Sequence, residues 1–233
     1  MPLAAATAPS LSAVPGLVHG FERRDGRASF AESRDETRRR VGESLADRGR
    51  LLLLQQVHGA RIVRAPWDGT PEADGALADG PGLFLGIETA DCLPVVVVDP
   101  RRRALAAVHA GWRGAALGIA ARAVEALVAA GSRAEDLVAA LGPCIGACCY
   151  EVGEDVRVAF GASADGLFSP GPAGKPHFDL RRASVRRLEA AGVPPGAITH
   201  VDECTRCHPE LYHSYRRDGK GAGRMISFAG FAR

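Results

Sequence analysis

Lysine is nearly absent from this chain: Lys175 and Lys220 are its two lysines, and the remaining 27 of its 29 basic residues are arginines. With 27 acidic residues, the formal net charge is only +2. A protein that binds nucleic acid or a membrane surface through bulk charge carries a marked excess of basic residues. We therefore expect neither nucleic acid nor a membrane as a partner.

Long hydrophobic runs are also missing, since no stretch reaches the roughly 18 consecutive apolar residues that a membrane-spanning helix needs. The N-terminus has no basic segment, and Pro2, Pro9 and Pro15 interrupt its apolar residues, which argues against a secretory signal. We expect a cytoplasmic protein whose residues 1–16 form a flexible N-terminal segment.

What the chain does have is the composition of an ordinary globular domain, with 233 residues of which 46% are hydrophobic. Apolar runs alternate with amphipathic stretches, and this pattern predicts intermixed strands and helices. The predicted strands are residues 51–57, 61–63, 83–87, 94–98, 104–109, 137–141, 198–201 and 225–228. The predicted helices are residues 114–130, 153–160 and 180–191, with Asp179 as the N-cap of the last. We predict one α/β domain over residues 17–233.

Six cysteines and seven histidines are too few and too irregularly spaced for a secreted disulfide scaffold. Three of them stand at predicted strand ends or turns beside glycine or proline, where a side chain is held rigidly yet open to solvent. They are His58 in Gln55-Gln56-Val57-His58-Gly59, Cys92 in Thr89-Ala90-Asp91-Cys92-Leu93-Pro94, and His109 in Ala107-Val108-His109-Ala110-Gly111-Trp112-Arg113-Gly114. Their spacing matches no zinc-finger pattern, and each taken alone is typical of a structural residue.

These segments together resemble the YfiH-like, laccase-domain family. The resemblance extends through Leu141-Gly142-Pro143-Cys144-Ile145-Gly146, Cys149-Tyr150-Glu151-Val152-Gly153, Asp202-Glu203-Cys204-Thr205 and Ser214-Tyr215-Arg216-Arg217. The matches run in order from about residue 17 to the C-terminus. The resemblance implies a layered α/β/β/α fold with mixed sheets, built from two similar halves by an internal duplication.

The resemblance also implies an activity. Members of the family are described as zinc-dependent purine nucleoside enzymes that phosphorolyse adenosine, inosine and methylthioadenosine, giving ribose 1-phosphate or methylthioribose 1-phosphate and the free base. They also deaminate adenosine to inosine, and some bacterial members are described as peptidoglycan editing factors. The expected partners are thus a purine nucleoside and phosphate.

The resemblance places the metal on His58, Cys92 and His109. Two imidazoles and one thiolate are good ligands for Zn²⁺, and three protein ligands leave a fourth position for water or substrate. Cu²⁺ can replace Zn²⁺ at such a site because it binds more tightly to many ligand sets.

Two residues beside these ligands are candidates for catalytic roles. Arg113 is predicted to open a helix, where its planar guanidinium and the helix N-terminus would favour phosphate; a surface arginine packed on Trp112 is the alternative. Asp91 precedes Cys92 and could orient a ligand or transfer a proton, or stabilise a turn. Glu88 is a speculative proton shuttle, because the chain lacks the motif of the nucleobase deaminases.

The remaining cysteines carry weaker signals. Cys148 and Cys149 are adjacent, and we expect them in the core or a pocket wall rather than on one ion. Cys204 and Cys207 form a C-x-x-C sequence with His208 beside it, and a second zinc site there is a minor alternative to a plain loop. The backbone of residues 142–146 is either an anion-binding turn or a structural one.

Three rival functions follow from the same residues. A multicopper phenol oxidase needs many histidine ligands, and only His58 and His109 lie in the matched motifs. A cysteine hydrolase or amidase that edits peptidoglycan precursors would use Cys92 as nucleophile and His109 as base. A binding module without catalysis is the third rival. We expect a monomer.

Overall fold

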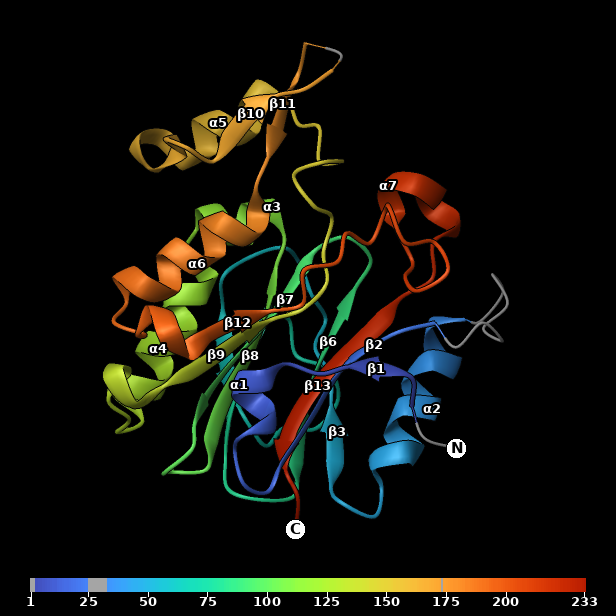
Figure 1. Ribbon diagram of the computed structural model, residues 1–233. Helices are drawn as coiled ribbons and strands as arrows, with labels where there is room; N and C mark the ends of the chain where they lie inside the picture. The colour runs from blue at the N-terminus through green and yellow to red at the C-terminus, as the bar shows by residue number, and fades with distance from the viewer. Residues whose placement is uncertain (1–2, 25–32, 173) are drawn as a thin grey trace.

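A mixed sheet of six strands forms the centre of the molecule (Figure 1). The computed structural model describes residues 3–24, 33–172 and 174–233. The strands, in order across this sheet, are β12 (Ile198–His200), β9 (Val138–Leu141), β7 (Leu93–Asp99), β8 (Ala104–Ala110), β5 (Gly75–Asp79) and β4 (Ile62–Arg64). Every residue of β7 and β8 is buried. Such continuous apolar runs are typical of strands covered on both faces.

A second sheet packs on one face of the first. Its five strands, in order, are β1 (Ala5–Ala6), β2 (Leu17–Glu22), β13 (Met225–Phe231), β6 (Leu83–Thr89) and β3 (Arg50–Leu52). Phe21, Leu85 and Phe231 of this sheet share one apolar core with Val96 and Leu105 of the six-stranded sheet. Burial of this interface, on both sides, removes large side chains from water and holds the sheets together.

Helices cover the two outer faces. Helix α2 (Arg34–Leu45) packs Val41 and Leu45 on the five-stranded sheet. Helices α4 (Ile119–Ala129) and α6 (Leu180–Ala190) cover the outer face of the six-stranded sheet, on the other side of the molecule (Figure 1). The layers therefore follow the order α/β/β/α, which confirms the expected fold class.

The other elements are short. They are the helices α1 (Pro9–Ser12), α3 (Trp112–Ala116), α5 (Glu154–Phe160) and α7 (Tyr215–Asp218), and the hairpin of β10 (Phe168–Pro170) and β11 (Pro176–Phe178). Four 3-10 turns complete them, at Ala134–Asp136, Gly161–Ala164, Pro195–Ala197 and Gly219–Gly221. No helix among the described residues is long and apolar enough to cross a membrane.

The predicted elements are largely present. Most of their bounds shift by one to three residues, as in β13, which continues to Phe231, and two differences are larger. The helix predicted over residues 114–130 is two helices, α3 and α4, because Gly118 adopts a left-handed backbone (φ 77°) between them. The strand predicted over residues 51–57 ends at Leu52, and the following residues form the loop that carries His58. Gly131 follows α4 in a left-handed conformation (φ 101°), which ends the helix.

The sequence predicts a flexible segment over residues 1–16, and the structure describes residues 3–16 of this segment. Residues 1–2 lie outside the described residues, but β1 pairs with β2, and Leu11 of α1 is buried in the core between the sheets. The hydroxyl of Ser10 donates to Ala139 O, 3.1 Å away. Ala6, Ala8 and Leu11 thus contribute side chains to the core between the sheets.

Candidate metal centre and active site

The structure brings His58, Cys92 and His109 together. Strands β7 and β8 are antiparallel with Pro94 opposite His109, so Cys92, just before β7, lies beside the end of β8. His58 arrives on the loop between β3 and β4. One ligand atom of each residue lies within 4.8 Å of the other two, a separation that a single ion can span.

Backbone conformation aims these side chains. His58 has a φ of 61°, a left-handed conformation that costs free energy for a residue with a Cβ and is common at functional sites. The backbone of Gly111 lies against the three side chains, so that a Cβ there would lie 2.9 Å from His58 Cδ2 and 3.3 Å from Cys92 Sγ. The site therefore requires glycine at this position.

A buried carboxylate, Asp74, holds two of these residues in place, and the sequence analysis missed it. Its Oδ1 lies 2.8 Å from His109 Nδ1, and the same carboxylate accepts N–H groups of Val57, His58 and Gly59 at 3.1, 2.9 and 2.6 Å. Burial opposes its ionisation, but the hydrogen bonds from His109 and Gly59 hold the pKa of this carboxyl below its ordinary value. An aspartate among the small apolar residues 73–78 was the signal that could have identified it.

Asp74 also fixes how His109 can act. A carboxylate that holds Nδ1 leaves Nε2 facing the site, where it can bind a metal ion once its proton has left; this arrangement orients metal-binding histidines. The ring of His58 lies edge-on to that of His109, with centroids 4.9 Å apart.

Cys92 and His109 change each other's ionisation. Burial alone would raise the pKa of the Cys92 thiol, but the attraction of His109 and hydrogen bonds from His109 and His58 lower it to about 6. Burial alone would lower the pKa of His109, but the Cys92 thiolate and Asp74 raise it to about 9. At neutral pH the pair is a thiolate beside an imidazolium, and a metal ion would displace the imidazolium proton.

The three side chains open into a cavity of about 440 Å³, within the range of roughly 300–1,000 Å³ typical of small-molecule sites. Its other lining residues are mostly polar or aromatic: Arg34, Gln56, Glu88, Thr89, Ala90, Asp91, Ile145, Tyr150, Tyr215, Arg216 and Arg224. Tyr150 and Tyr215 supply rings, and three arginines supply positive charge.

Asp91 lies in this cavity wall, where both of its carboxylate oxygens are engaged. Oδ1 accepts the hydroxyl of Thr205 and Oδ2 accepts the N–H of Arg216, each at 2.6 Å. Its backbone is left-handed (φ 86°), and its carbonyl accepts from Ile145 N. These contacts tie three segments together and place Arg216 in the cavity.

Glu88 is also in the wall, and its contacts argue against a proton shuttle. Arg34 and Arg38 both donate to its carboxylate, at distances of 2.6 to 3.0 Å. Burial opposes ionisation, but the two guanidinium groups hold the pKa of Glu88 below its ordinary value. The carboxylate therefore stays charged and anchors Arg34 at the cavity.

Arg113 is not among the residues that line the cavity. Its side chain is exposed, and its guanidinium carbon lies 4.3 Å from the centre of the Trp112 ring. This is the surface packing that the sequence left as the alternative to a phosphate contact. Arg216 and Arg224 lie in the cavity instead.

The donor chemistry of the three residues suits a metal ion. Two imidazole nitrogens and a thiol whose pKa is lowered by its neighbours offer three ligands, and a buried carboxylate orients one imidazole. In the described chain, neither group of clustered metal-competent side chains has more than two histidines, which does not suit a multicopper cluster.

Residues 10–232 match the family described as "Multi-copper polyphenol oxidoreductase laccase". A protein named purine nucleoside phosphorylase from Deinococcus radiodurans is 38% identical over 213 residues, covering 91% of this chain and 81% of that protein. Adenosine deaminase RL5, from an unknown prokaryotic organism, is 40% identical over 150 residues, which are 63% of this chain and 57% of that protein. The crystal structure of YlmD from Geobacillus stearothermophilus superposes with a TM-score of 0.84 at 30% identity and covers 100% of both chains.

The chain therefore belongs to this laccase-like family, as the motifs indicated. It is an enzyme, since the relatives it matches are named for catalytic activities.

Proposed function

We propose that this enzyme processes purine nucleosides, by phosphorolysis of adenosine, inosine and methylthioadenosine and by deamination of adenosine. In phosphorolysis, a phosphate oxygen forms a bond to C1′ of the ribose as the bond from C1′ to the purine nitrogen breaks, and the base leaves with a proton. In deamination, water replaces the 6-amino group and ammonia leaves. Relatives named for each activity support the pairing of the two reactions.

The observation that carries the proposal is the content of one cavity. The three-ligand set, two tyrosine rings and three arginines all line the same space of about 440 Å³. A nucleoside and a phosphate need just these partners: flat apolar surface for the base and cations for the anion.

The chain's own residues divide the task. Tyr150 and Tyr215 offer rings against which a purine can pack. The guanidinium carbon of Arg216 lies 5.3 Å from the centre of the Tyr150 ring, and its Nη1 donates to Glu151 O at 2.7 Å, so this cation is held in place before substrate arrives.

We assign the metal as Zn²⁺ on His58, Cys92 and His109. When bound there, zinc supplies a Lewis acid and lowers the pKa of a water molecule that it holds. Asp74 keeps His109 in the metal-binding tautomer, and Glu88 keeps Arg34 in the wall.

Product analysis tests the proposal. Zinc-loaded protein incubated with adenosine and phosphate should release adenine and ribose 1-phosphate, and inosine should accumulate when phosphate is omitted. Loss of all products after chelation and their return with zinc would support the assignment. A zinc-replete, folded protein that forms none of them would refute it.

A pair of arginine variants tests the phosphate subsite. Arg224 donates to the carbonyls of Ala222 and Gly223, both at 3.0 Å. A hydrogen bond to a charged group contributes about 1.5–3 kcal/mol, so Arg224→Gln should raise the KM for phosphate by roughly 10- to 100-fold while adenosine deamination continues. Arg113→Gln is the matched control and should leave both reactions unchanged. A raised KM for phosphate in Arg113→Gln, with none in Arg224→Gln, would show that Arg113 binds the phosphate.

The thiolate–imidazolium pair favours a second candidate, a metal-independent cysteine amidase that acts on peptidoglycan precursors. The two functions differ in their need for metal. Activity on a muramyl-peptide substrate that survives chelation and is abolished by alkylation of Cys92 would favour the amidase.

A further inference from the structure

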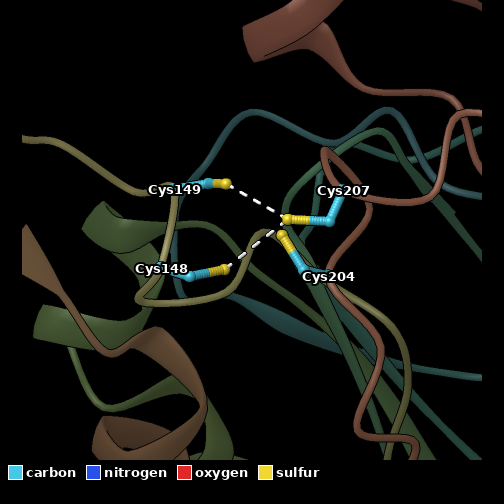
Figure 2. Close-up of side chains that lie close together, drawn as sticks. All are labelled: Cys148, Cys149, Cys204 and Cys207. Carbon is cyan, nitrogen blue, oxygen red and sulfur yellow. Dashed lines mark hydrogen bonds between the residues drawn. The ribbon is translucent and has the colours of Figure 1, made fainter.

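A second group of metal-competent side chains lies outside the cavity. The sulfur atoms of Cys148, Cys149, Cys204 and Cys207 all lie within 4.8 Å of one another. Figure 2 shows the two pairs on facing loops with their thiols pointing into the space between them. We call these four residues the cysteine cluster. The sequence leads us to expect that Cys148 and Cys149 do not share one ion, but their sulfur atoms point to the same space. The minor alternative of a zinc site at Cys204 and Cys207 includes His208, which is not a member of the cluster.

The sheet topology explains why these loops meet. Strand β12 runs parallel to β9, so the chain leaves both strands at the same edge. The parallel pairing continues past the strands, where Cys144 and Cys204 form a bridge and Thr205 N donates to Cys144 O at 3.0 Å. Each loop then turns sharply: Cys149 N donates to Gly146 O and Cys207 N to Cys204 O.

The distances within the cluster suit one tetrahedral ion. The sulfur of Cys207 lies 3.8 Å from that of Cys148 and 3.4 Å from that of Cys149. Four thiolates at about 2.3 Å from a zinc ion stand about 3.8 Å apart. A disulfide would bring two sulfurs to about 2.05 Å, and all six cysteines of the chain are free thiols.

The surroundings of Cys204 suit a thiolate. The N–H of Gly146 donates to its sulfur at 3.2 Å, and the N–H groups of Arg206 and Cys207 face the same atom. Donors aimed at sulfur stabilise its charged form. Gly146 also makes room, because a Cβ there would lie 3.2 Å from Cys148 Sγ and 3.2 Å from Cys204 Cβ.

We propose that this cluster binds one structural Zn²⁺ ion through four thiolates, separate from the metal of the cavity. Four sulfur ligands complete a tetrahedron and leave no position for substrate, which is the pattern of a structural rather than a catalytic site. Cys149 and Cys204 lie in the motifs that resemble the family, whereas Cys148 and Cys207 lie beside them.

The ion would fasten one wall of the cavity. The first loop carries Ile145 and Tyr150, which line the cavity. The second loop carries Thr205, whose hydroxyl donates to Asp91, and Asp91 in turn accepts from Arg216 N. Joining the two loops through zinc would fix the positions of Tyr150 and Arg216.

Metal analysis of reduced protein, purified without chelators, tests the proposal. The wild type should hold two zinc ions per chain. His58→Ala should keep only the ion of the cluster, Cys207→Ser should keep only the ion of the cavity, and the double variant should hold none. Cys144→Ala, which removes a buried thiol outside both sets, is the control and should keep both.

Cobalt provides a spectroscopic check that does not depend on activity. In the His58→Ala background, Co²⁺ should give the intense visible and sulfur-to-metal bands of a tetrahedral four-thiolate site. The same bands should be missing after Cys207→Ser.

A third measurement needs no variant, in case Cys207→Ser fails to fold. Cys148 and Cys207 are exposed, so alkylation followed by peptide mapping reports whether metal covers them. They should resist iodoacetamide in zinc-replete wild-type protein and react after chelation. One zinc per chain that disappears with His58→Ala, iron in place of zinc, a cluster disulfide in the reduced protein, or rapid alkylation of Cys148 and Cys207 with zinc present would each overturn the proposal.

Discussion

The cavity site and the cysteine cluster each gather metal-competent side chains within 4.8 Å, but they are built in opposite ways. The cavity site has three candidate ligands of two kinds, a buried carboxylate behind one of them, and a cavity of about 440 Å³ in front. The cysteine cluster has four candidate ligands of one kind on two surface loops, and backbone N–H groups donate to one of its sulfur atoms.

This difference in ligand sets is what we expect between a catalytic metal site, in the cavity, and a structural metal site, in the cysteine cluster. A reacting centre needs an open coordination position and a rigid support, and buried Asp74, just before strand β5, supplies that support. A structural ion needs a full set of protein ligands and no open position for substrate. The ligand sets of the cavity site and of the cysteine cluster would meet these two requirements separately.

The largest effect on turnover should come from opening the cavity site. A catalytic metal contributes several kcal/mol to the transition state, so His58→Ala should lower kcat/KM by roughly a thousandfold or more. The cluster ion should remain, and the thermal melt should stay cooperative. His200→Ala, at an exposed histidine on β12, is the matched control. Equal loss of kcat/KM in His58→Ala and His200→Ala would show that the loss does not come from the cavity site.

A smaller loss should follow from removing the support behind the ligands. Asn at position 74 keeps the shape of Asp74 but can no longer accept from both His109 and three backbone N–H groups. Changes of this kind typically cost about 10- to 100-fold in metal affinity or activity, and zinc titration of Asp74→Asn should show that loss.

Asp79→Asn, at the exposed end of β5, the strand that follows Asp74, should change zinc affinity little. Full zinc affinity in Asp74→Asn would show that Asp74 acts on folding alone. Rescue of turnover by excess zinc would show that its role is to position the ligands.

The fold was predictable where hydrophobic pattern decides it. The apolar runs at residues 94–98 and 104–109 predicted the strands β7 and β8, which the structure shows to be buried along their whole length. The break at Gly118 was not predictable, because glycine inside a helical pattern is compatible with an intact helix.

The site was predictable only where a motif named its residues. His58, Cys92 and His109 came from motifs, whereas Asp74 and the cysteine cluster depend on strand pairing between segments far apart in the chain. The adjacent residues Cys148 and Cys149 argued against a shared ion until the loops were seen to face each other. Arg113 stood in a strong motif, yet the turn into α3 stacks it on Trp112.

In the metal-free protein, the lowered pKa of Cys92 should make this thiol several-fold more reactive near neutral pH than the buried thiol of Cys144. Its lowered pKa contributes stability that is complete above the ordinary value of 9.0 and is lost as pH falls toward about 6. The raised pKa of His109 contributes stability that is complete below 6.5 and is lost as pH rises toward about 9. Folded and unfolded chains therefore bind equal numbers of protons on this pair between these limits, and its contribution to stability should be flat there.

The rate of alkylation as a function of pH reports the ionisation of the Cys92 thiol directly, whereas the contribution of the pair to the free energy of unfolding should not change with pH in this range. After chelation, the iodoacetamide reaction of Cys92 should reach half its maximal rate near pH 6, while buried Cys144, whose pKa burial raises to about 12, should stay unreactive. His109→Ala should move the midpoint for Cys92 upward. A midpoint near the ordinary value of a thiol in the wild type would show that the two side chains are not paired.

The smallest effect on turnover should come from the cysteine cluster. Cys207→Ser removes one thiol of the cluster and leaves every cavity residue in place, so kcat should change by no more than a few fold. Unfolding should respond more strongly, because an ion bound at a thousandfold above its Kd stabilises by about 4 kcal/mol and a chain of this size loses roughly 2–4 °C per kcal/mol. We therefore expect the Tm to fall by about 10 °C, and the KM for nucleoside to rise because Tyr150 and Arg216 are held less firmly. The opposite result is a Cys207→Ser variant that keeps the cavity zinc and loses as much kcat as His58→Ala does. That result would show that the cysteine cluster takes part in catalysis and is not only structural.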